Sequence, residues 1–182
     1  MAAPSHLRVL YLTHLSKPAS DRSIYRYLRQ VRVTSILEIG LGQAERSLRM
    51  IELAGLHAPA QEIRYTGVDP FEARDPADGP GLNLKTAHRL LKATGARVQL
   101  LPGDPLSAIA RTANSLQNID LVVVSASATL AMEETWFYVP RMLHAGSRIF
   151  MEHARGKEVE FRQLGAADVA RLCPTTRRRR AA

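Results

Sequence analysis

The residues with the clearest chemical potential follow a short apolar run early in the chain, where residues 35–45 read SILEIGLGQAE. The run ends in Glu38 and leads to two glycines, Gly40 and Gly42, where a helical pattern begins. Glycine has no Cβ and accepts φ > 0, so a glycine turn lets backbone N–H groups approach a ligand closely. The start of the following helix adds unsatisfied N–H donors and a positive dipole end. This pattern predicts a strand, a tight turn and a helix that bind a nucleotide-like cofactor.

Acidic residues follow the next two apolar runs. Asp69 ends the second run, 29 positions after Gly40. A carboxylate that leaves the strand next to a glycine turn is placed to hydrogen-bond the diol of a ribose. Asp104 follows the third run, directly before Pro105. Asp104 is a candidate ligand contact, but it is also a good N-cap for a helix whose first residue is Pro105, and capping alone would explain it.

Extended and helical patterns alternate along the chain. Apolar runs predict strands at residues 36–39, 63–68, 98–101, 119–124 and 148–151. Five strands joined by right-handed helical crossovers predict an α/β fold with a doubly wound, mostly parallel, Rossmann-like sheet in a single domain. The run at residues 119–124 is apolar throughout, so we expect this strand near the centre of the sheet.

Segments outside this alternation need separate interpretations. Residues 7–13, which read LRVLYLT, are interpreted as an additional edge strand, and residues 159–164 as a sixth extended element. Residues 71–84 are rich in Pro, Gly and Asp, which predicts a mobile loop over the ligand crevice at the carboxyl edge of the sheet.

Two predicted helices contain residues that typically begin or interrupt a helix. Ser20 is expected to cap a helix whose apolar positions are Ile24, Tyr27, Leu28 and Val31. Pro140 should kink or split a helix predicted at residues 132–143.

The spacing Glu38-x-Gly40-x-Gly42, with Asp69 and Asp104 at the next two strand ends, resembles the class I S-adenosylmethionine-dependent methyltransferases. The resemblance covers residues 35–152. It implies that Glu38, Gly40 and Gly42 belong to an S-adenosylmethionine site in which the glycine loop contacts the methionine part of the cofactor. It also implies that Asp69 binds the ribose hydroxyls and that Asp104 meets the adenine amino group.

The chain departs from that family at the end of the fourth strand and near its C-terminus. Residues 125–127 read SAS, where many members carry an acidic or Asn-Pro-Pro-Tyr type motif. About 30 residues follow the fifth strand, and they contain one plausible strand where the family usually has an antiparallel pair. The methyl acceptor and the catalytic residues are therefore unknown. The alternative to an enzyme is a non-catalytic module of this fold that binds a cofactor or nucleic acid.

Other cofactor and metal chemistries find less support. A dinucleotide site would favour glycine at the position of Glu45 and an acidic residue about 20 positions after the turn. No GxxxxGK[ST] loop is present, and six scattered histidines with Cys173 as the single cysteine make no zinc motif. Glu152 and His153 follow the fifth strand at the edge where the ligand is expected. They could serve as a base or a substrate contact, or they could be a solvated loop pair.

Composition and charge set the remaining expectations. The 182 residues are 46% hydrophobic and carry a formal net charge of +8, half of it in the four arginines at positions 177–180. This tail is expected to be a disordered, solvated terminus, with nucleic acid as a possible partner. We expect an N-terminal arm and helix (1–34), a methyltransferase-like core (35–165) and a C-terminal segment (166–182). Without a signal-peptide pattern or a membrane-length apolar run, the chain is expected to be cytoplasmic.

Overall fold

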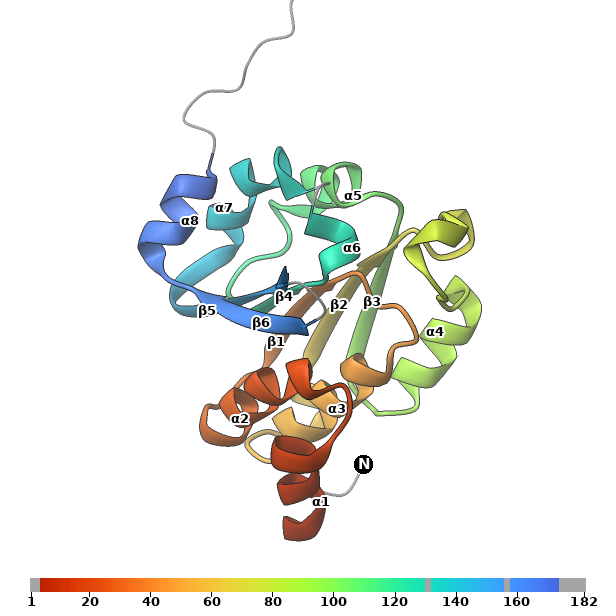
Figure 1. The fold of residues 1–182 in the computed structure, drawn as a ribbon, viewed down its shortest axis with the longest axis vertical. Coiled ribbons are helices and arrows are strands. Elements are labelled where there is room, and N and C mark those ends of the chain that lie inside the picture. The colour runs from red at the N-terminus through yellow and green to blue at the C-terminus, as the bar shows by residue number, and fades with distance from the viewer. Residues whose placement is uncertain (1–3, 130–131, 156–157, 174–182) are drawn as a thin grey trace, which may run out of the picture.

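A computed structural model describes residues 4–129, 132–155 and 158–173. Its centre is a six-stranded sheet in the order β3-β2-β1-β4-β5-β6 (Figure 1). The strands are β1 (Ser35–Ile39), β2 (Arg64–Asp69), β3 (Arg97–Pro102), β4 (Ile119–Val124), β5 (Leu143–Arg155) and β6 (Glu158–Leu164). The five predicted strands and the sixth extended element are all present. The doubly wound α/β prediction is therefore confirmed.

The first five strands are parallel, and β6 alone runs antiparallel, beside β5. The carboxyl ends of β1, β2 and β3 therefore lie at the same edge of the sheet, where Gly40 N–H donates to the Val68 carbonyl and Gly103 N–H to the Asp69 carbonyl. The apolar run of β4 lies between β1 and β5 and is buried on both faces, as its composition predicts.

Helices cover both faces of the sheet, because alternate strand residues point to opposite sides. Ile36 and Leu121 pack with α2 (Arg22–Gln30), α3 (Glu45–Ala54) and α4 (Leu84–Lys92). Leu37 and Val122 pack with α5 (Pro105–Thr112), α6 (Ala126–Thr129), α7 (Val139–Met142) and α8 (Ala166–Leu172). Figure 1 shows these two groups of helices on opposite sides of the sheet. No helix in the described part of the chain is long and apolar enough to cross a membrane.

The edge strand predicted at residues 7–13 is wrong, because this segment is helical. It forms α1 (His6–Leu10), which continues as the π-helical turn η1 (Tyr11–Leu15). Val9 and Leu12 are buried three positions apart, and the Thr13 hydroxyl donates to the Val9 carbonyl at 2.8 Å. The burial therefore follows a helical period, which the short run LRVLYLT does not distinguish from strand alternation.

Other helix details differ from expectation by small shifts. Ser20 is not the cap, because the short 3-10 helix η2 (Ala19–Asp21) leads directly into α2. Tyr25, not Tyr27, is the fully buried tyrosine of α2. Pro140 does split the following helix, as predicted: η7 (Thr135–Phe137) precedes α7, and Pro140 lies in the first turn of α7.

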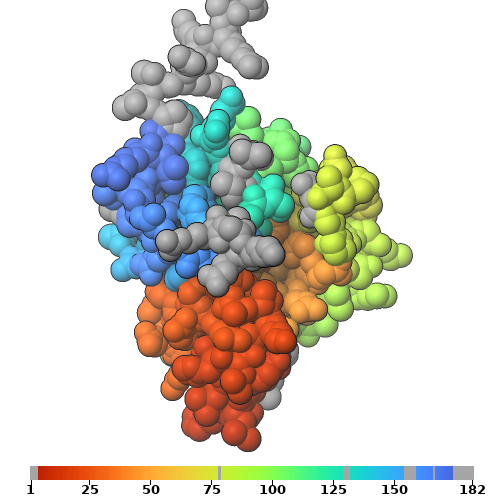
Figure 2. Space-filling view, in the orientation of Figure 1, coloured from red at the N-terminus to blue at the C-terminus, as the bar shows by residue number. Residues whose placement is uncertain are grey.

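Residues 71–84 connect β2 to α4 through two 3-10 turns, η4 (Phe71–Ala73) and η5 (Pro76–Asp78). Figure 2 shows this segment, in yellow, as a lobe at the edge of the molecule. Its position beside the carboxyl ends of the strands agrees with the sequence prediction. Its structure is held by specific contacts described below. The four arginines at positions 177–180 lie outside the described residues.

Candidate cofactor site

The site begins where the sheet changes winding direction, between β1 and β4. Ligands of open α/β sheets bind at such a switch point, outside the carboxyl ends of the strands. Gly40 lies there with φ +86°, and a Cβ at Gly40 would lie 2.9 Å from the Ser125 Cβ. Both the backbone conformation and the close approach of β4 therefore require glycine at this position.

A cavity of about 160 Å³ opens at this edge. Three of the predicted residues line it, namely Gly40, Asp69 and Asp104, and so do Arg74 and Ser127. Ligand pockets for molecules of cofactor size usually measure about 300–1,000 Å³. The cavity is therefore only part of such a pocket in this conformation.

Asp69 is 2% exposed and accepts hydrogen bonds on both carboxylate oxygens. Leu41 N–H donates to Oδ2 at 2.8 Å, and Gly42 N–H makes a longer contact of 3.4 Å with the same oxygen. Phe71 N–H donates to Oδ1 at 2.9 Å. The Arg74 guanidinium also donates to Oδ2. The predicted ribose-binding carboxylate thus joins the glycine turn to the 71–84 segment.

Asp104 is the N-cap of α5, with Pro105 as the first helical residue, as the sequence predicts. Its side chain accepts from Ser107 N–H at 2.9 Å, and these hydrogen bonds lower the pKa of the Asp104 carboxyl below its ordinary value. Asp104 also lines the cavity and is exposed. The structure therefore combines the capping role with a position where a ligand could meet the ionised carboxylate.

Gly42 has φ +57°, and a Cβ there would meet nothing within 4 Å. Its carbonyl accepts a hydrogen bond from Leu82 N–H at 3.2 Å. Gly42 is therefore needed for the backbone conformation of the turn, whereas Gly40 is also needed for the close contact with the residue that follows β4.

Glu38 is fully buried and does not line the cavity. Its carboxylate accepts hydrogen bonds from Arg46 Nε at 2.7 Å and from the Ser47 and Tyr65 hydroxyls at 2.5 Å each. Burial and the adjacent Glu38 carboxylate raise the pKa of Tyr65 well above its ordinary value, so Tyr65 remains a donor. Glu38 thus supports the glycine turn from beneath.

Arg46 connects this carboxylate to the switch point. One guanidinium nitrogen, Nη2, donates to the Gly40 carbonyl at 3.0 Å and to the Ser125 hydroxyl at 2.5 Å, and Nη1 lies 3.8 Å from the carboxylate of Asp21. Burial acts to lower the pKa of Arg46, but the carboxylates of Glu38 and Asp21 outweigh burial and raise it. Arg46 therefore stays charged and fixes the ends of β1 and β4 to the N-terminal segment.

Sequence reasoning missed both arginines of this site. Arg46 and Arg74 carry no motif, and their positions depend on partners that only folding brings near. One feature of the sequence could have indicated Arg46. Glu38 lies within an apolar strand, and a buried carboxylate needs a charged partner.

Glu152 and His153 lie at the carboxyl end of β5, next to the end of β4. The Glu152 carboxylate accepts from Ala126 N–H at 2.8 Å. The Nε2 atom of His153 is buried without a hydrogen-bond partner in the part of the chain that is described. These contacts assign neither residue to catalysis.

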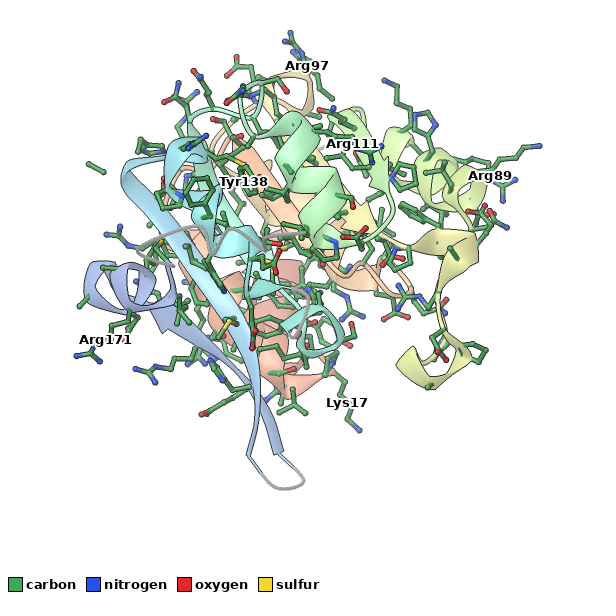
Figure 3. The ribbon with its side chains drawn as sticks, turned by 90° about the horizontal axis from the view of Figure 1, so that it is seen from above. Lys17, Arg89, Arg97, Arg111, Tyr138 and Arg171 are labelled. Carbon is green, nitrogen blue, oxygen red and sulfur yellow. The ribbon has the colours of Figure 1, made fainter. Side chains whose placement is uncertain are left out.

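Basic side chains on the outer surface are widely distributed. Arg89, Arg97, Arg111 and Arg171 are exposed, and Figure 3 shows the first, second and fourth of them at different edges of the molecule and Arg111 over α5. These four side chains do not converge on a common surface in this view.

Methyltransferases are among the solved structures that share this architecture. CalS11, a calicheamicin methyltransferase, is 17% identical with a TM-score of 0.56, and the match covers 80% of this chain and 75% of CalS11. A putative protein-L-isoaspartate O-methyltransferase from Plasmodium falciparum, solved with S-adenosylhomocysteine, is 11% identical with a TM-score of 0.55, covering 82% and 66%. Precorrin-6y C5,15-methyltransferase from Geobacter metallireducens is 19% identical with a TM-score of 0.52, covering 79% and 66%.

The chain has the class I methyltransferase fold. Its sequence matches no protein-family model and no curated protein sequence. The chain spans 66% of the precorrin-6y enzyme and 56% of a methyltransferase from Thiobacillus denitrificans. In the described residues the methyltransferase fold closes with a single antiparallel strand, β6, followed by α8.

Proposed function

We propose that this chain binds S-adenosylmethionine at the β1–β4 switch point and transfers its methyl group to an acceptor. The observation that carries this proposal is the convergence of Gly40, Asp69 and Asp104 on one cavity at the carboxyl edge of a methyltransferase fold. They come from three different strand ends, and parallel pairing alone brings them together.

The donor and acceptor groups at this edge suit a nucleoside cofactor. Asp69 would accept hydrogen bonds from the ribose hydroxyls, the Gly40–Gly42 turn would contact the methionine part, and Asp104 would meet the adenine amino group. A buried side-chain nitrogen, Arg74 Nε, has no hydrogen-bond partner among the described residues, which supports a ligand or a rearrangement at this place. Because the cavity is small, the 71–84 segment must move to admit a molecule of this size.

Bound S-adenosylmethionine would supply a methyl group activated by its positively charged sulfur, for in-line transfer to an acceptor nucleophile with S-adenosylhomocysteine as the leaving group. The chain's own contribution is to hold both partners in register and to exclude water, since positioning alone can supply a large part of a displacement barrier. Ser127, in α6 directly after β4, and Glu152, near the carboxyl end of β5, would border the side from which an acceptor approaches. No catalytic residue is assigned.

Isothermal titration with S-adenosylmethionine, S-adenosylhomocysteine and NAD⁺ tests the proposal. We expect saturable binding of the first two and none of NAD⁺. Absence of binding to both sulfur compounds, or preferential binding of NAD⁺, would contradict it. Binding of both without transfer to small-molecule, protein or nucleic-acid acceptors would favour the non-catalytic module instead.

A further inference from the structure

Arg74 lines the cavity at the carboxyl edge of the sheet. Its side chain is 9% exposed, and its guanidinium donates to Asp69 Oδ2. A Cβ at Gly81 would overlap Arg74 Nε and come within 3.0 Å of the Cδ and Cζ atoms. The absence of a side chain at Gly81 therefore makes room for the Arg74 side chain.

The same segment makes one further contact with the glycine turn and one within itself. Leu82 N–H donates to the Gly42 carbonyl at 3.2 Å, and Leu84 N–H donates to the Glu72 carboxylate at 3.0 Å. Phe71 is buried with φ +50°, a conformation that bulky residues rarely adopt, and its N–H is held by Asp69. Strain of this kind persists only where the surroundings fix it, and it concentrates at sites that switch.

The hydrogen bonds on Asp69 leave little capacity for a ligand. An ionised carboxylate offers about four acceptor positions. Asp69 already accepts from four donors, one each from Leu41, Gly42, Phe71 and Arg74. A ribose diol brings two more donors. Among the present donors only Arg74 is a side chain, so it can leave without unfolding the glycine turn.

We infer that Arg74 is a latch: by pairing with Asp69 it holds the 71–84 segment closed over the cavity, and a ligand diol must displace it to bind. The identity of the ligand rests on the proposed function, whereas the latch itself is a property of the free protein. The apparent dissociation constant of a ligand is its intrinsic value divided by the fraction of molecules with an open site, so a closed latch weakens binding.

Two variants release the latch in different ways. Arg74→Met removes the charged group and keeps most of the side-chain volume. Gly81→Ala keeps the arginine but places a methyl group where its guanidinium stem lies, and this flexible side chain can yield without disturbing the core. Arg32→Met is the matched control, because Arg32 pairs with Glu62 on the open surface.

Hydrogen exchange of the ligand-free proteins tests the latch without any cofactor. We expect backbone amides in residues 71–84 to exchange about tenfold faster in Arg74→Met and Gly81→Ala than in the wild type and in Arg32→Met, because the local opening equilibrium shifts. Equal exchange in all four proteins would overturn the inference.

Calorimetric titration with S-adenosylhomocysteine tests the competition with ligand. We expect both latch variants to bind about tenfold more tightly than the wild type. Unchanged or weaker binding by Arg74→Met would overturn the inference, since Arg74 would then be neutral or a ligand contact. If none of the proteins binds S-adenosylhomocysteine, the proposed function fails, and the exchange measurement still decides whether the latch exists.

Discussion

Arg46 Nε donates to Glu38 Oε1 at 2.7 Å directly beneath the glycine turn, in a position where Glu38 has no contact with solvent. The acidic residue of the motif and a residue at the start of α3 thus form one buried ion pair. Because Arg46 also holds the Gly40 carbonyl and the Ser125 hydroxyl, the pair fixes the geometry of the switch point.

Breaking that pair should destabilise the whole domain. Arg46→Met leaves the Glu38 carboxylate buried without its charge partner, and such changes typically cost about 3–5 kcal/mol. Urea denaturation measures the loss in the free energy of unfolding. Arg32→Met, which removes an exposed pair, should cost less than about 1 kcal/mol. A similar small cost for both variants would contradict the structural role of Arg46.

Alanine at the two glycines of the turn should have unequal effects. Gly40→Ala combines positive φ with a Cβ 2.9 Å from Ser125, so it should lower stability and abolish detectable binding of S-adenosylhomocysteine. Gly42→Ala meets open space and carries only the backbone penalty of about 1–2 kcal/mol. Thermal unfolding and calorimetric titration compare them. Equal losses of binding would argue against a special role for Gly40.

Asp69→Asn, made in the Arg74→Met background so that the latch makes no contribution, should weaken S-adenosylhomocysteine binding by about tenfold or more, because hydrogen bonds to an ionised group contribute roughly 1.5–3 kcal/mol. The amide keeps one acceptor oxygen for the N–H groups of the turn, so folding should survive. Asp75→Asn is the control, since Asp75 lies on the exposed part of the 71–84 segment. A dissociation constant equal to that of Arg74→Met alone would exclude Asp69 as the ribose ligand.

Asp120 should contribute stability that depends on pH. Its carboxylate accepts hydrogen bonds from the N–H groups of Thr34 and Ser35 and from His144 Nε2. Burial acts to raise the pKa of Asp120, but these hydrogen bonds outweigh it and lower the pKa below its ordinary value of 3.8. The stabilisation is therefore complete above the unfolded-state pKa and is lost as the pH falls through the lower folded-state pKa.

Comparison of wild type with Asp120→Asn at several pH values tests that assignment. The variant should be less stable by about 1.5–3 kcal/mol at pH 7, since the bonds to a charged acceptor are lost. The difference should shrink once the pH falls below about 4. A difference that stays constant from pH 7 to pH 3 would show that ionisation of Asp120 is not responsible.

The arginine tail gives a test of acceptor class. If the acceptor is RNA or DNA, deletion of residues 177–182 should weaken nucleic-acid binding and flatten its dependence on salt, because each phosphate contact releases condensed counterions. If the acceptor is a small molecule, deletion should leave turnover unchanged. Affinity measured across a salt series distinguishes the two cases. Superimposed curves for the full and truncated chains would exclude the tail as a nucleic-acid contact.

The sequence alone determined the alternation of strands and helices and the placement of Gly40, Asp69 and Asp104 at strand ends. These features depend on local patterns: apolar runs, a glycine turn and an Asp-Pro cap. Parallel pairing then brings consecutive strand ends to one edge, so the convergence of these residues follows from the fold class. The helical N-terminus escaped this reasoning because a seven-residue run is too short for its period to be unambiguous.

Only the tertiary structure decided what surrounds those residues. Arg46 meets Ser125 across 79 positions, and the Leu41 N–H meets Asp69 across 28, so neither contact leaves a local pattern in the sequence. Arg74 reaches Asp69 because the turns of the 71–84 segment and the absence of a side chain at Gly81 leave room for it. Glu38 lies beneath the glycine turn, not in the cavity, because strand alternation points it toward Tyr65 and α3. Side-chain partners of this kind depend on packing between distant segments, which a single sequence does not encode in any local spacing.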